Sequence, residues 1–406
     1  MASNQAQDDT LAQLKAGILR GDKQLKLSCG LTQFPQEIFD LADSLEILDL
    51  SGNALRDLPC DLNRLTKLRI LFCSSNQFTH LPEVLGECEN LSMIGFKANQ
   101  IRHIPENAIP TATLRWFIVT DNALKTVPSA LGDCRQLQKL MLAGNQLTTL
   151  PESMANCHAL ELIRISANQF NAIPEFLFDL PKLTWLAYAG NPFSSEIEQN
   201  LIRQYQINHI DWQTLTLQNV LGQGASGVVY QATWQPKDQA AEAVAVKLFK
   251  SGLTSDGLPR CEMHANILAG EHPNLVGVKG VVHNHPQGTL GLVMPLLDAD
   301  LKVLAAPPSF ESCSRDVYAQ DLTLTPDEVQ HIVQGITSAA KHLHARDLMH
   351  GDIYAHNILW NAQKVVLSDL GGASFLPLDN QALTQNLLKL EARALEVLVQ
   401  ELLNVS

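Results

Sequence analysis

The chain has 406 residues, of which 46% are hydrophobic and 17% charged, and its formal net charge is −13. This length exceeds the size at which one hydrophobic core keeps growing, so two domains are expected. The negative charge, which no basic stripe offsets, argues against nucleic acid or an anionic membrane surface as the main partner.

The N-terminal segment, residues 1–10, is polar and acidic, without the basic start and apolar run of a signal peptide. No stretch of the sequence approaches the roughly 20 apolar residues that a membrane-spanning helix needs. We therefore expect a cytoplasmic protein without a membrane span. Residues 1–24 are predicted to form an N-terminal helix or cap.

A repeat of 23 residues fills the region 25–193. One unit reads Leu-x-x-Leu-x-Leu-x-x-Asn-x-Leu-x-x-Leu-Pro, as in residues 45–59. This pattern resembles the leucine-rich repeat in its intracellular form, and the resemblance implies a horseshoe-shaped solenoid of about eight repeats. The leucines and asparagines that keep the step are Leu45, Leu68, Leu91, Leu114, Leu137, Leu160 and Leu183, and Asn53, Asn76, Asn99, Asn122, Asn145, Asn168 and Asn191.

The columns of the repeat predict how it is built. Alternating leucines form a short strand whose inward side chains make a continuous core. The asparagines satisfy backbone groups where the chain leaves each strand, as a ladder of buried hydrogen bonds. Prolines such as Pro59 and Pro82 fix φ and start helical or extended turns on the convex side. One column holds small core residues rather than disulfide cysteines: Leu65, Cys88, Cys134, Cys157 and Leu180.

The strand side chains that alternate with the core leucines should point onto the concave face. The largest of them are apolar: Phe72, Met93, Trp116, Met141 and Trp185. Contiguous apolar patches mark interaction sites, and large aromatic side chains anchor them. We predict that this face binds a protein partner or packs on the second domain. A register shifted by one residue would instead bury these side chains.

Residues 194–209 follow the last repeat and predict a helical C-terminal cap and a short linker. The region 210–406 then contains four motifs in a fixed order. They are Leu221-Gly-Gln-Gly-Ala-Ser-Gly-Val-Val229, Val244-Ala-Val-Lys247, His350-Gly-Asp-Ile-Tyr-Ala-His-Asn357 and Ser368-Asp-Leu-Gly371. This ordered set resembles the signature of eukaryotic-type protein kinases, and it implies a bilobal kinase-like fold with an N-lobe at 210–297 and a C-lobe at 298–406.

The first motif predicts a loop that covers the phosphates of ATP. A turn without Cβ atoms lets backbone N–H groups approach phosphate oxygens closely, which explains Gly222, Gly224 and Gly227. By resemblance, Leu221 and Val229 border the same nucleotide, with Val229 against the adenine ring.

Lys247 ends an apolar strand, where a buried ammonium group needs an anion. The resemblance implies that this lysine acts in catalysis by holding the α- and β-phosphates, with a carboxylate of the next helix as its partner. Glu262 is the best candidate, and Glu271 is the alternative, although it comes late in the segment. Met294, on a strand leading to the hinge between the lobes, would flank the adenine pocket.

Thr325 and the proline after it predict the start of a helix that runs to about His344 and leads to the third motif. There Asp352 matches the catalytic aspartate, which accepts or orients the proton of the attacking hydroxyl. Asn357 and Asp369 match the two ligands of Mg²⁺, an ion that prefers hard oxygen donors.

Several features depart from the kinase pattern. Gly351 replaces the arginine that usually precedes the catalytic aspartate and pairs with a phosphorylated loop, so we expect activity without loop phosphorylation. The segment after Asp369 is short and has no Ala-Pro-Glu motif. Residues 391–403 resemble the large central helix of the C-lobe, with Glu391 where that helix usually starts with aspartate. The sequence ends three residues later, and we expect a shortened C-lobe.

The order of the two regions resembles the bacterial leucine-rich-repeat protein kinases. This resemblance implies an ATP- and Mg²⁺-dependent Ser/Thr protein kinase whose repeats recruit a protein partner or substrate. The first alternative is a leucine-rich-repeat scaffold whose shortened kinase fold binds nucleotide without turning it over. The third motif also resembles small-molecule phosphotransferases of the aminoglycoside and choline kinase type, which is the second alternative.

Overall fold

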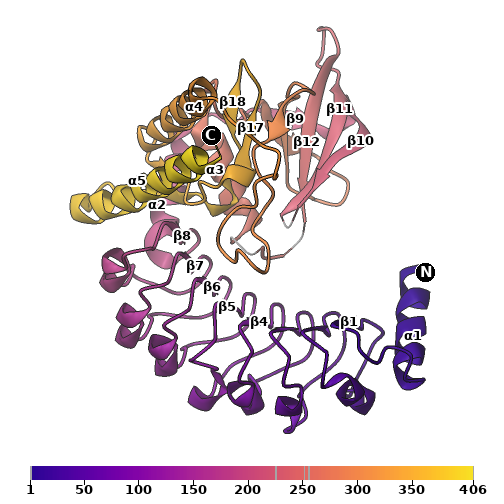
Figure 1. Cartoon of the computed structure of the whole chain (residues 1–406). Coiled ribbons are helices and arrows are strands. Elements are labelled where there is room, and N and C mark those ends of the chain that lie inside the picture. The colour runs from indigo at the N-terminus through magenta and orange to yellow at the C-terminus, as the bar shows by residue number, and fades with distance from the viewer. Residues whose placement is uncertain (1, 225, 251, 255–256, 406) are drawn as a thin grey trace. The chain divides into compact units, whose positions relative to one another are not determined.

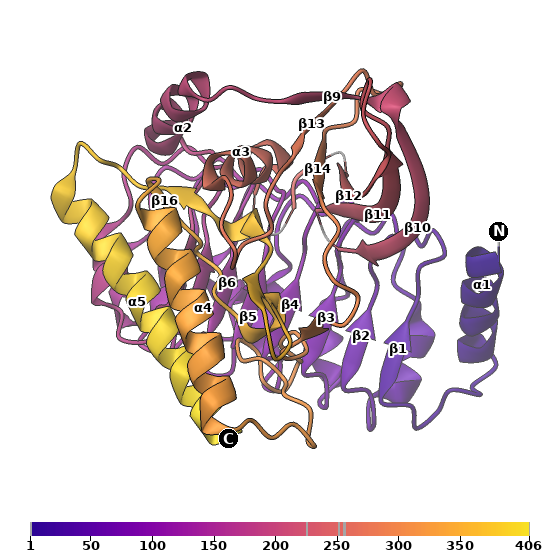
Figure 2. The same cartoon turned by 90° about the horizontal axis from the view of Figure 1, so that it is seen from above.

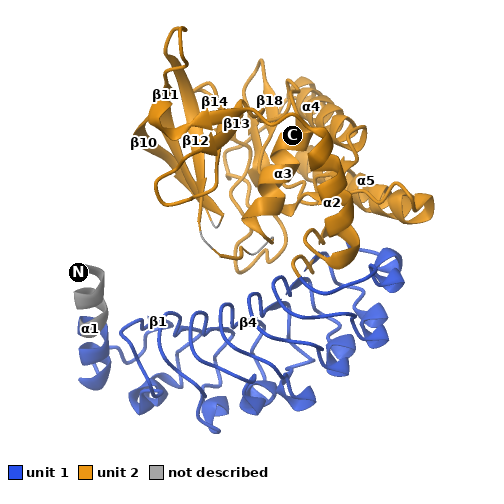
Figure 3. Cartoon of the chain, turned by 180° about the vertical axis from the view of Figure 1, so that it is seen from behind, with its two compact units in different colours: residues 1–163, 168–183 blue, residues 164–167, 184–406 orange. Residues whose placement is uncertain are grey.

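The computed structural model describes residues 2–224, 226–250, 252–254 and 257–405. The chain forms two compact units, one of residues 1–163 and 168–183 and one of residues 164–167 and 184–406 (Figure 3). These units do not follow the predicted division at residue 193, because the end of the repeat region clusters with the second unit.

The first unit is a solenoid of short parallel strands (Figure 1). Each strand residue lies opposite the residue 23 positions later, as Leu48 opposite Leu71, so the sequence period is also the register of the sheet. The elements are helix α1 (Ala2–Lys15) and strands β1 (Gln24–Lys26), β2 (Ile47–Asp49), β3 (Ile70–Phe72), β4 (Met93–Gly95), β5 (Trp116–Ile118), β6 (Lys139–Met141) and β7 (Leu162–Arg164).

Short 3₁₀ helices form the opposite edge of the solenoid. Pro82 precedes the third of them with an extended backbone, φ −62°, and its fixed φ ends the strand conformation there. The predicted convex turns are thereby confirmed as helical. Their bounds are η1 (Gln36–Leu41), η2 (Leu62–Arg64), η3 (Glu83–Glu87), η4 (Glu106–Ala108), η5 (Ser129–Asp133), η6 (Glu152–Asn156) and η7 (Glu175–Asp179).

The predicted asparagine ladder is present. Asn76 Nδ2 donates to the carbonyls of Leu50 and Cys73 at 2.9 and 3.1 Å, and its Oδ1 accepts from the Leu55 N–H at 2.9 Å. Asn145 makes the same set of bonds three repeats later, to Val119, Leu142 and Leu124. Each asparagine therefore ties its own turn to the preceding repeat and satisfies buried backbone groups.

The cysteine column is confirmed as core. Cys88, Cys134 and Cys157 are buried and form no disulfide. Burial raises the pKa of the Cys88 and Cys134 thiols to about 12 and that of Cys157 to about 11, so these thiols stay neutral and behave as small apolar side chains.

The second unit holds a six-stranded sheet and a mainly helical region (Figures 1 and 2). The order of the sheet is β10-β11-β12-β14-β13-β9. The elements are β8 (Trp185–Ala187), α2 (Pro192–Gln204), β9 (His209–Asp211), η8 (Trp212–Thr214), β10 (Leu215–Gln223), β11 (Gly227–Trp234), β12 (Glu242–Phe249), α3 (Pro259–Ala269), β13 (Gly280–His283), β14 (Gly291–Pro295), β15 (Lys302–Val303), α4 (Pro326–His344), β16 (Leu348–Met349), η9 (Ala355–Asn357), β17 (Ile358–Trp360), β18 (Val365–Leu367), η10 (Leu370–Gly372), β19 (Ser374–Phe375) and α5 (Gln381–Asn404).

Helices α4 and α5 lie side by side and bury one face each in the core of this region (Figure 2). The predicted start of α4 is confirmed, because Thr325 and Glu328 form a reciprocal capping box. Helix α5 starts earlier than the predicted 391–403. The Asn380 side chain accepts from the Leu383 N–H at 3.1 Å, which caps the helix eleven residues before Glu391.

Helix α2 was predicted as a cap of the repeats. Its apolar residues Ile197, Leu201 and Ile202 instead pack against the core of the second unit, so this helix belongs to that unit. Among the described residues, every helix is too short or too polar to cross a bilayer.

Candidate active site

The glycine-rich turn joins β10 to β11, and two of its glycines face open space. A Cβ atom placed on Gly222 or Gly224 would meet nothing within 4 Å, which leaves room above the turn for a ligand. Glycine is required at position 227 for a different reason, because a Cβ atom there would lie 2.5 Å from the Leu248 carbonyl oxygen on β12. Residue 225, inside the motif, lies outside the described residues.

Lys247 lies on β12, directly opposite Val229 of β11, and its ammonium group forms an ion pair with Glu262 of α3. Both side chains are largely buried, at 15% and 4% exposure. Burial raises the pKa of Glu262, and the nearby Asp369 raises it further, while the Lys247 charge opposes both effects. The structure thus pairs Lys247 with the glutamate predicted for it, and Glu271 instead lines a cavity away from this pair.

Val229 and Met294 belong to one apolar cluster, together with Ala245 on the strand between theirs. Met294 is 8% exposed and Val229 is half-buried, so they form an apolar wall next to the glycine-rich turn. Leu221 is 51% exposed and stands apart from this cluster. The exposed apolar surface of Leu221 is available to pack against a flat aromatic ring such as adenine.

The third motif is held by buried backbone contacts. His350 is fully buried, and its Nε2 lies 3.0 Å from the Ser368 carbonyl oxygen, next to Asp369. Asn357 Nδ2 donates to the Asp352 carbonyl at 3.0 Å, and the Ser368 hydroxyl donates to the Asn357 carbonyl at 2.8 Å. These bonds bring the third and fourth motifs together, so Asp352, Asn357 and Asp369 share one region.

Asp352 itself is paired with a residue that the sequence did not indicate. Its Oδ1 lies 2.8 Å from Nη2 of Arg164, the last residue of β7. Burial favours the neutral acid, but the charges of Arg164, His356 and His350 and the Arg164 hydrogen bond outweigh it and hold the pKa of Asp352 below its usual range. Asp352 is therefore a carboxylate at neutral pH.

Asn357 and Asp369 offer oxygen donors of the kind that Mg²⁺ prefers. The Asn357 side-chain nitrogen donates its hydrogen bond to the Asp352 carbonyl, so the Oδ1 atom of Asn357 is the one that could bind the ion. Asp369 adopts a left-handed backbone, φ 59°, and one carboxylate oxygen accepts from the Gly371 N–H at 3.0 Å. Its side chain is exposed and leaves the second oxygen for an ion. The donor set fits a magnesium ion bound mainly by substrate phosphates and water.

Two further acids support the catalytic loop, and sequence reasoning gave neither of them that role. Glu391 Oε1 accepts from the Gly351 N–H at 2.8 Å, and Glu391 Oε2 pairs with His344. Asp316 lies 2.7 Å from His356 Nδ1 and also accepts from the backbone at residue 355. Their signal in the sequence is weak, because both partners lie about 40 residues away.

The residues predicted for the concave face have different surroundings. Phe72 and Trp116 are half-buried, and the Lys139 ammonium group lies 4.4 Å from the centroid of the Trp116 ring. Met93 and Met141 are buried at 2% and 6% exposure. The inward phase is confirmed by the fully buried core leucines, which exclude the shifted register: Leu48, Leu50, Leu71, Leu140, Leu142 and Leu186.

Trp185, the fifth of these residues, contacts the catalytic loop within the second unit. Its indole N–H donates to the Ile353 carbonyl at 3.2 Å, and its ring stacks on Tyr354 with centroids 4.1 Å apart. The guanidinium carbon of Arg315 lies 4.1 Å from the same ring centroid. Of the two predicted roles, binding a protein partner or packing on the second domain, Trp185 has the second.

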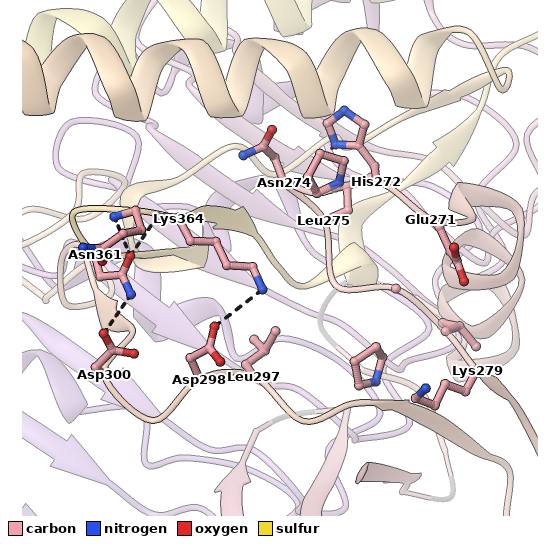
Figure 4. Close-up of a pocket in the computed structure, with 15 residues that line it drawn as sticks. Glu271, His272, Asn274, Leu275, Lys279, Leu297, Asp298, Asp300, Asn361 and Lys364 are labelled. Carbon is pink, nitrogen blue, oxygen red and sulfur yellow. Dashed lines mark hydrogen bonds and ion pairs between the residues drawn. The ribbon is translucent and has the colours of Figure 1, made fainter. Parts of the chain in front are cut away.

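A cavity of about 890 Å³ lies elsewhere in the second unit (Figure 4). Its lining comes from the segment 271–279 after α3, the residues 295–300 after β14 and the turn 361–364. Figure 4 shows Lys364 directed at Asp298 and Asn361 directed at Asp300, with separations of 3.8 and 3.0 Å. Its lining includes Glu271, the alternative partner of Lys247, and the segment that follows Met294, but not Lys247, Glu262, Asn357 or Asp369.

Residues 215–405 match the family model described as protein tyrosine and serine/threonine kinase. The second unit contains a protein kinase domain. Residues 44–65 and 136–157 match the leucine-rich repeat. A solved structure of a leucine-rich-repeat protein from Leptospira interrogans covers 45% of this chain and 58% of its own, at 21% identity and a TM-score of 0.30.

Relatives match less than half of the chain. A protein of Acanthamoeba polyphaga mimivirus that is named as a serine/threonine-protein kinase is 23% identical over 187 residues, 46% of this chain and 31% of its own length. Serine/threonine-protein kinase PITSLRE of Drosophila melanogaster is 28% identical, over 38% of this chain and 15% of its own. Human ephrin type-B receptor 4 is 26% identical, over 46% and 18%.

The chain thus spans less than a third of the length of these relatives. They come from a virus and from animals, so the bacterial kinship predicted from the order of the two regions stays a prediction. What the comparisons establish is a kinase domain that follows leucine-rich repeats.

Proposed function

We propose that the protein is a cytoplasmic Ser/Thr protein kinase that depends on ATP and Mg²⁺ and whose repeats recruit a protein partner or substrate. The observation that carries the proposal is the buried ion pair between Lys247 and Glu262, beside the glycine-rich turn of the same domain. A buried lysine held by one carboxylate is ready to bind the phosphates of a nucleotide.

In the proposed reaction, the hydroxyl oxygen of the substrate attacks the γ-phosphorus of ATP. The bond from this phosphorus to the β,γ-bridging oxygen breaks, and ADP leaves with the electron pair. Asp352 orients the hydroxyl and takes its proton. Lys247 holds the α- and β-phosphates, and Leu221, Val229 and Met294 border the adenine.

Mg²⁺, when bound, neutralises charge on the phosphates. Asn357 and Asp369 would hold it, since the hydrogen bonds described above leave each of them one side-chain oxygen atom for the ion. Asn357 lies on the loop that carries Asp352, and Asp369 follows strands β17 and β18. The hydrogen bond from the Ser368 hydroxyl to the Asn357 carbonyl, at 2.8 Å, links the two segments.

The experiment that tests the activity is phosphotransfer from radiolabelled Mg²⁺–ATP to the protein itself and to a generic substrate such as myelin basic protein. Wild type is compared with Asp352→Asn and with Lys247→Met, and Lys237→Met serves as an exposed lysine control. We expect both site variants to lose at least 100-fold in rate and the control to match wild type. Equal rates in wild type and Asp352→Asn would remove the proposal.

A second function, a scaffold that binds nucleotide without turnover, is favoured by one observation. Only residues 370–380 separate Asp369 from α5, which leaves little chain to hold a peptide substrate. Under this alternative, ATP raises the melting temperature of wild type, but no phosphate is transferred.

The recruiting role of the repeats rests on Phe72 and Trp116, which are apolar and half-buried on the strands of the first unit. We expect Trp116→Ala to weaken capture of the partner in a pull-down while phosphotransfer to myelin basic protein is kept. Unchanged capture would contradict this part of the proposal.

A further inference from the structure

The catalytic loop lacks a permanent cation of its own. Residues 349–357 contain neither lysine nor arginine. The two histidines of the loop are engaged elsewhere, His350 with the Ser368 carbonyl and His356 with Asp316. The permanent positive charge at Asp352 comes instead from Arg164, at the end of β7.

Arg164 contacts two successive residues of the loop. Its Nη2 lies 2.8 Å from Asp352 Oδ1, and its Nη1 donates to the Gly351 carbonyl at 3.2 Å. The arginine side chain is 3% exposed. A planar guanidinium that forms an ion pair with a carboxylate and donates a hydrogen bond to the adjacent carbonyl restricts the direction of that carboxylate more than a flexible ammonium group would.

Two glycines make room for this contact. A Cβ atom on Gly372 would lie 3.2 Å from Arg164 Nη1 and 2.9 Å from the Asp352 Cβ. Gly351 has a left-handed backbone, φ 70°, and a Cβ there would lie 2.5 Å from the Gly372 carbonyl oxygen and 3.1 Å from that of Leu186. The arginine that is absent at position 351 therefore has no space there, and Arg164 brings a guanidinium to the same loop from outside.

Neighbouring side chains hold the same segment in place. Trp185 stacks on Tyr354 and donates to the Ile353 carbonyl at 3.2 Å. The Tyr188 hydroxyl donates to the Phe375 carbonyl at 2.8 Å. Within the second unit, the repeat-derived residues thus bind backbone on both sides of the proposed metal ligands, and Arg164 is one part of an ordered set of contacts.

We propose that Arg164 is a positioning residue for phosphotransfer, a guanidinium from the repeat sequence that holds Asp352 in one orientation. The proposal rests on the kinase activity proposed above. Oδ1, which forms the ion pair with Arg164, is buried, whereas the Asp352 side chain as a whole is 13% exposed. One side of the carboxylate therefore stays open to a hydroxyl, and phosphoryl transfer depends mainly on positioning.

The kinetic test compares Arg164→Ala, Arg164→Lys and wild type, with Arg102→Ala as the matched control, since Arg102 is exposed in the first unit. We expect Arg164→Ala to lose about 100-fold in kcat with little change in the KM for ATP. Guanidinium at millimolar concentration should restore part of the rate in Arg164→Ala and none in Asp352→Asn. An unchanged rate in Arg164→Ala would overturn the proposal. So would a higher rate, which would show that Arg164 inhibits phosphotransfer.

If Arg164→Ala does not fold, Arg164→Lys is compared with Arg164→Gln. The lysine variant, which keeps the charge, should retain several times the activity of the glutamine variant. Glutamine activity equal to that of lysine would contradict a role for the cation.

A second readout needs no activity and separates this proposal from the kinase proposal. The melting temperatures of Arg164→Gln, Asp352→Asn and the double variant form a cycle. We expect each single variant to melt several degrees lower than wild type, and the double variant no lower than the worse single one. Additive losses would show that the two groups do not act as a pair, whether or not the protein transfers phosphate.

Discussion

Glu391 accepts a hydrogen bond from the Gly351 N–H at 2.8 Å, and its other oxygen pairs with His344. The side chain is 1% exposed, at the centre of α5. One buried carboxylate therefore links the long C-terminal helix, the end of α4 and the residue that precedes Asp352.

We predict that Glu391→Ala destabilises the protein by about 2–4 kcal/mol, because it leaves the Gly351 N–H and the His344 ring without their partner in a buried place. Glu391→Gln, which keeps the acceptor oxygen for Gly351, should cost less than half as much. Urea denaturation measures both variants, and Glu396→Ala on the same helix, at an exposed position, is the control. Equal losses in the alanine and glutamine variants would show that the Gly351 bond contributes little.

The backbone of the repeats has a regular left-handed position that the residue types in the sequence indicate only in part. The residue before each ladder asparagine has a positive φ in every regular repeat, between 53° and 78°: Gly52, Ser75, Ala98, Asp121, Gly144, Ala167 and Gly190. Only three of these residues are glycine, although the left-handed conformation disfavours residues with a Cβ.

We therefore predict that Ala98→Gly stabilises the protein by about 0.5–1 kcal/mol, because it removes the strain of a left-handed alanine, φ 55°. The gain should appear as a rise in melting temperature of about 2–4 °C. Ala123→Gly is the matched control, since Ala123 lies in the same turn region without a positive φ, and there the added freedom of the unfolded chain should lower the melting temperature. A loss in Ala98→Gly as large as in the control would contradict this account.

Period and motif predicted most of the fold because each depends on residues close together in sequence. The strands, the asparagine ladder and the Lys247–Glu262 pair all depend on spacings of 26 residues or fewer. Arg164 was missed because its partner at residue 351 is 187 positions away, which no local pattern encodes. A signal was present, since Arg164 is the one arginine in a strand column that also holds Phe72, Ile118 and Met141.

The repeat pattern of the sequence also could not predict how the chain divides into units. The repeat consensus continues to Asn191, yet residues 184–193 cluster with the kinase domain. Their side chains are typical of repeat strands, and only the partners, such as Ser374 and Phe375 for Tyr188, assign them to the second unit. Periodicity predicts local conformation, and it does not predict which surface packs against which.

Glu106 links two repeats through a charge that depends on pH. Its carboxylate accepts from the N–H groups of Ser129 and Ala130 at 3.0 and 2.7 Å, at the start of η5 in the next repeat. The Ala130 bond is the main cause that holds the pKa of Glu106 below its usual range, with slight burial opposing it.

A lowered pKa in the folded state means that Glu106 stabilises the protein above its unfolded pKa, and that this contribution is lost as the pH falls through the folded value. We predict that Glu106→Gln costs about 0.5–1 kcal/mol at pH 7, a modest figure because the site is exposed. The gap between the two proteins should close between about pH 5 and pH 3. Chemical denaturation across this range measures it, and a gap that is constant with pH would show that the charge plays no part.

Asp369 is the residue whose charge should make nucleotide binding depend on metal. Its exposed carboxylate keeps one oxygen beyond the bond to Gly371, and Glu262 lies near enough to feel its charge. We predict that ADP raises the melting temperature of wild type by several degrees more with Mg²⁺ than with EDTA. In Asp369→Asn the increment due to Mg²⁺ should disappear, because the neutral amide is a weaker ligand for a hard cation. Asp379→Asn, an exposed aspartate in the same segment, should keep the full increment. Loss of the increment in both variants would instead assign it to general electrostatics, and its survival in Asp369→Asn would place the metal on other groups.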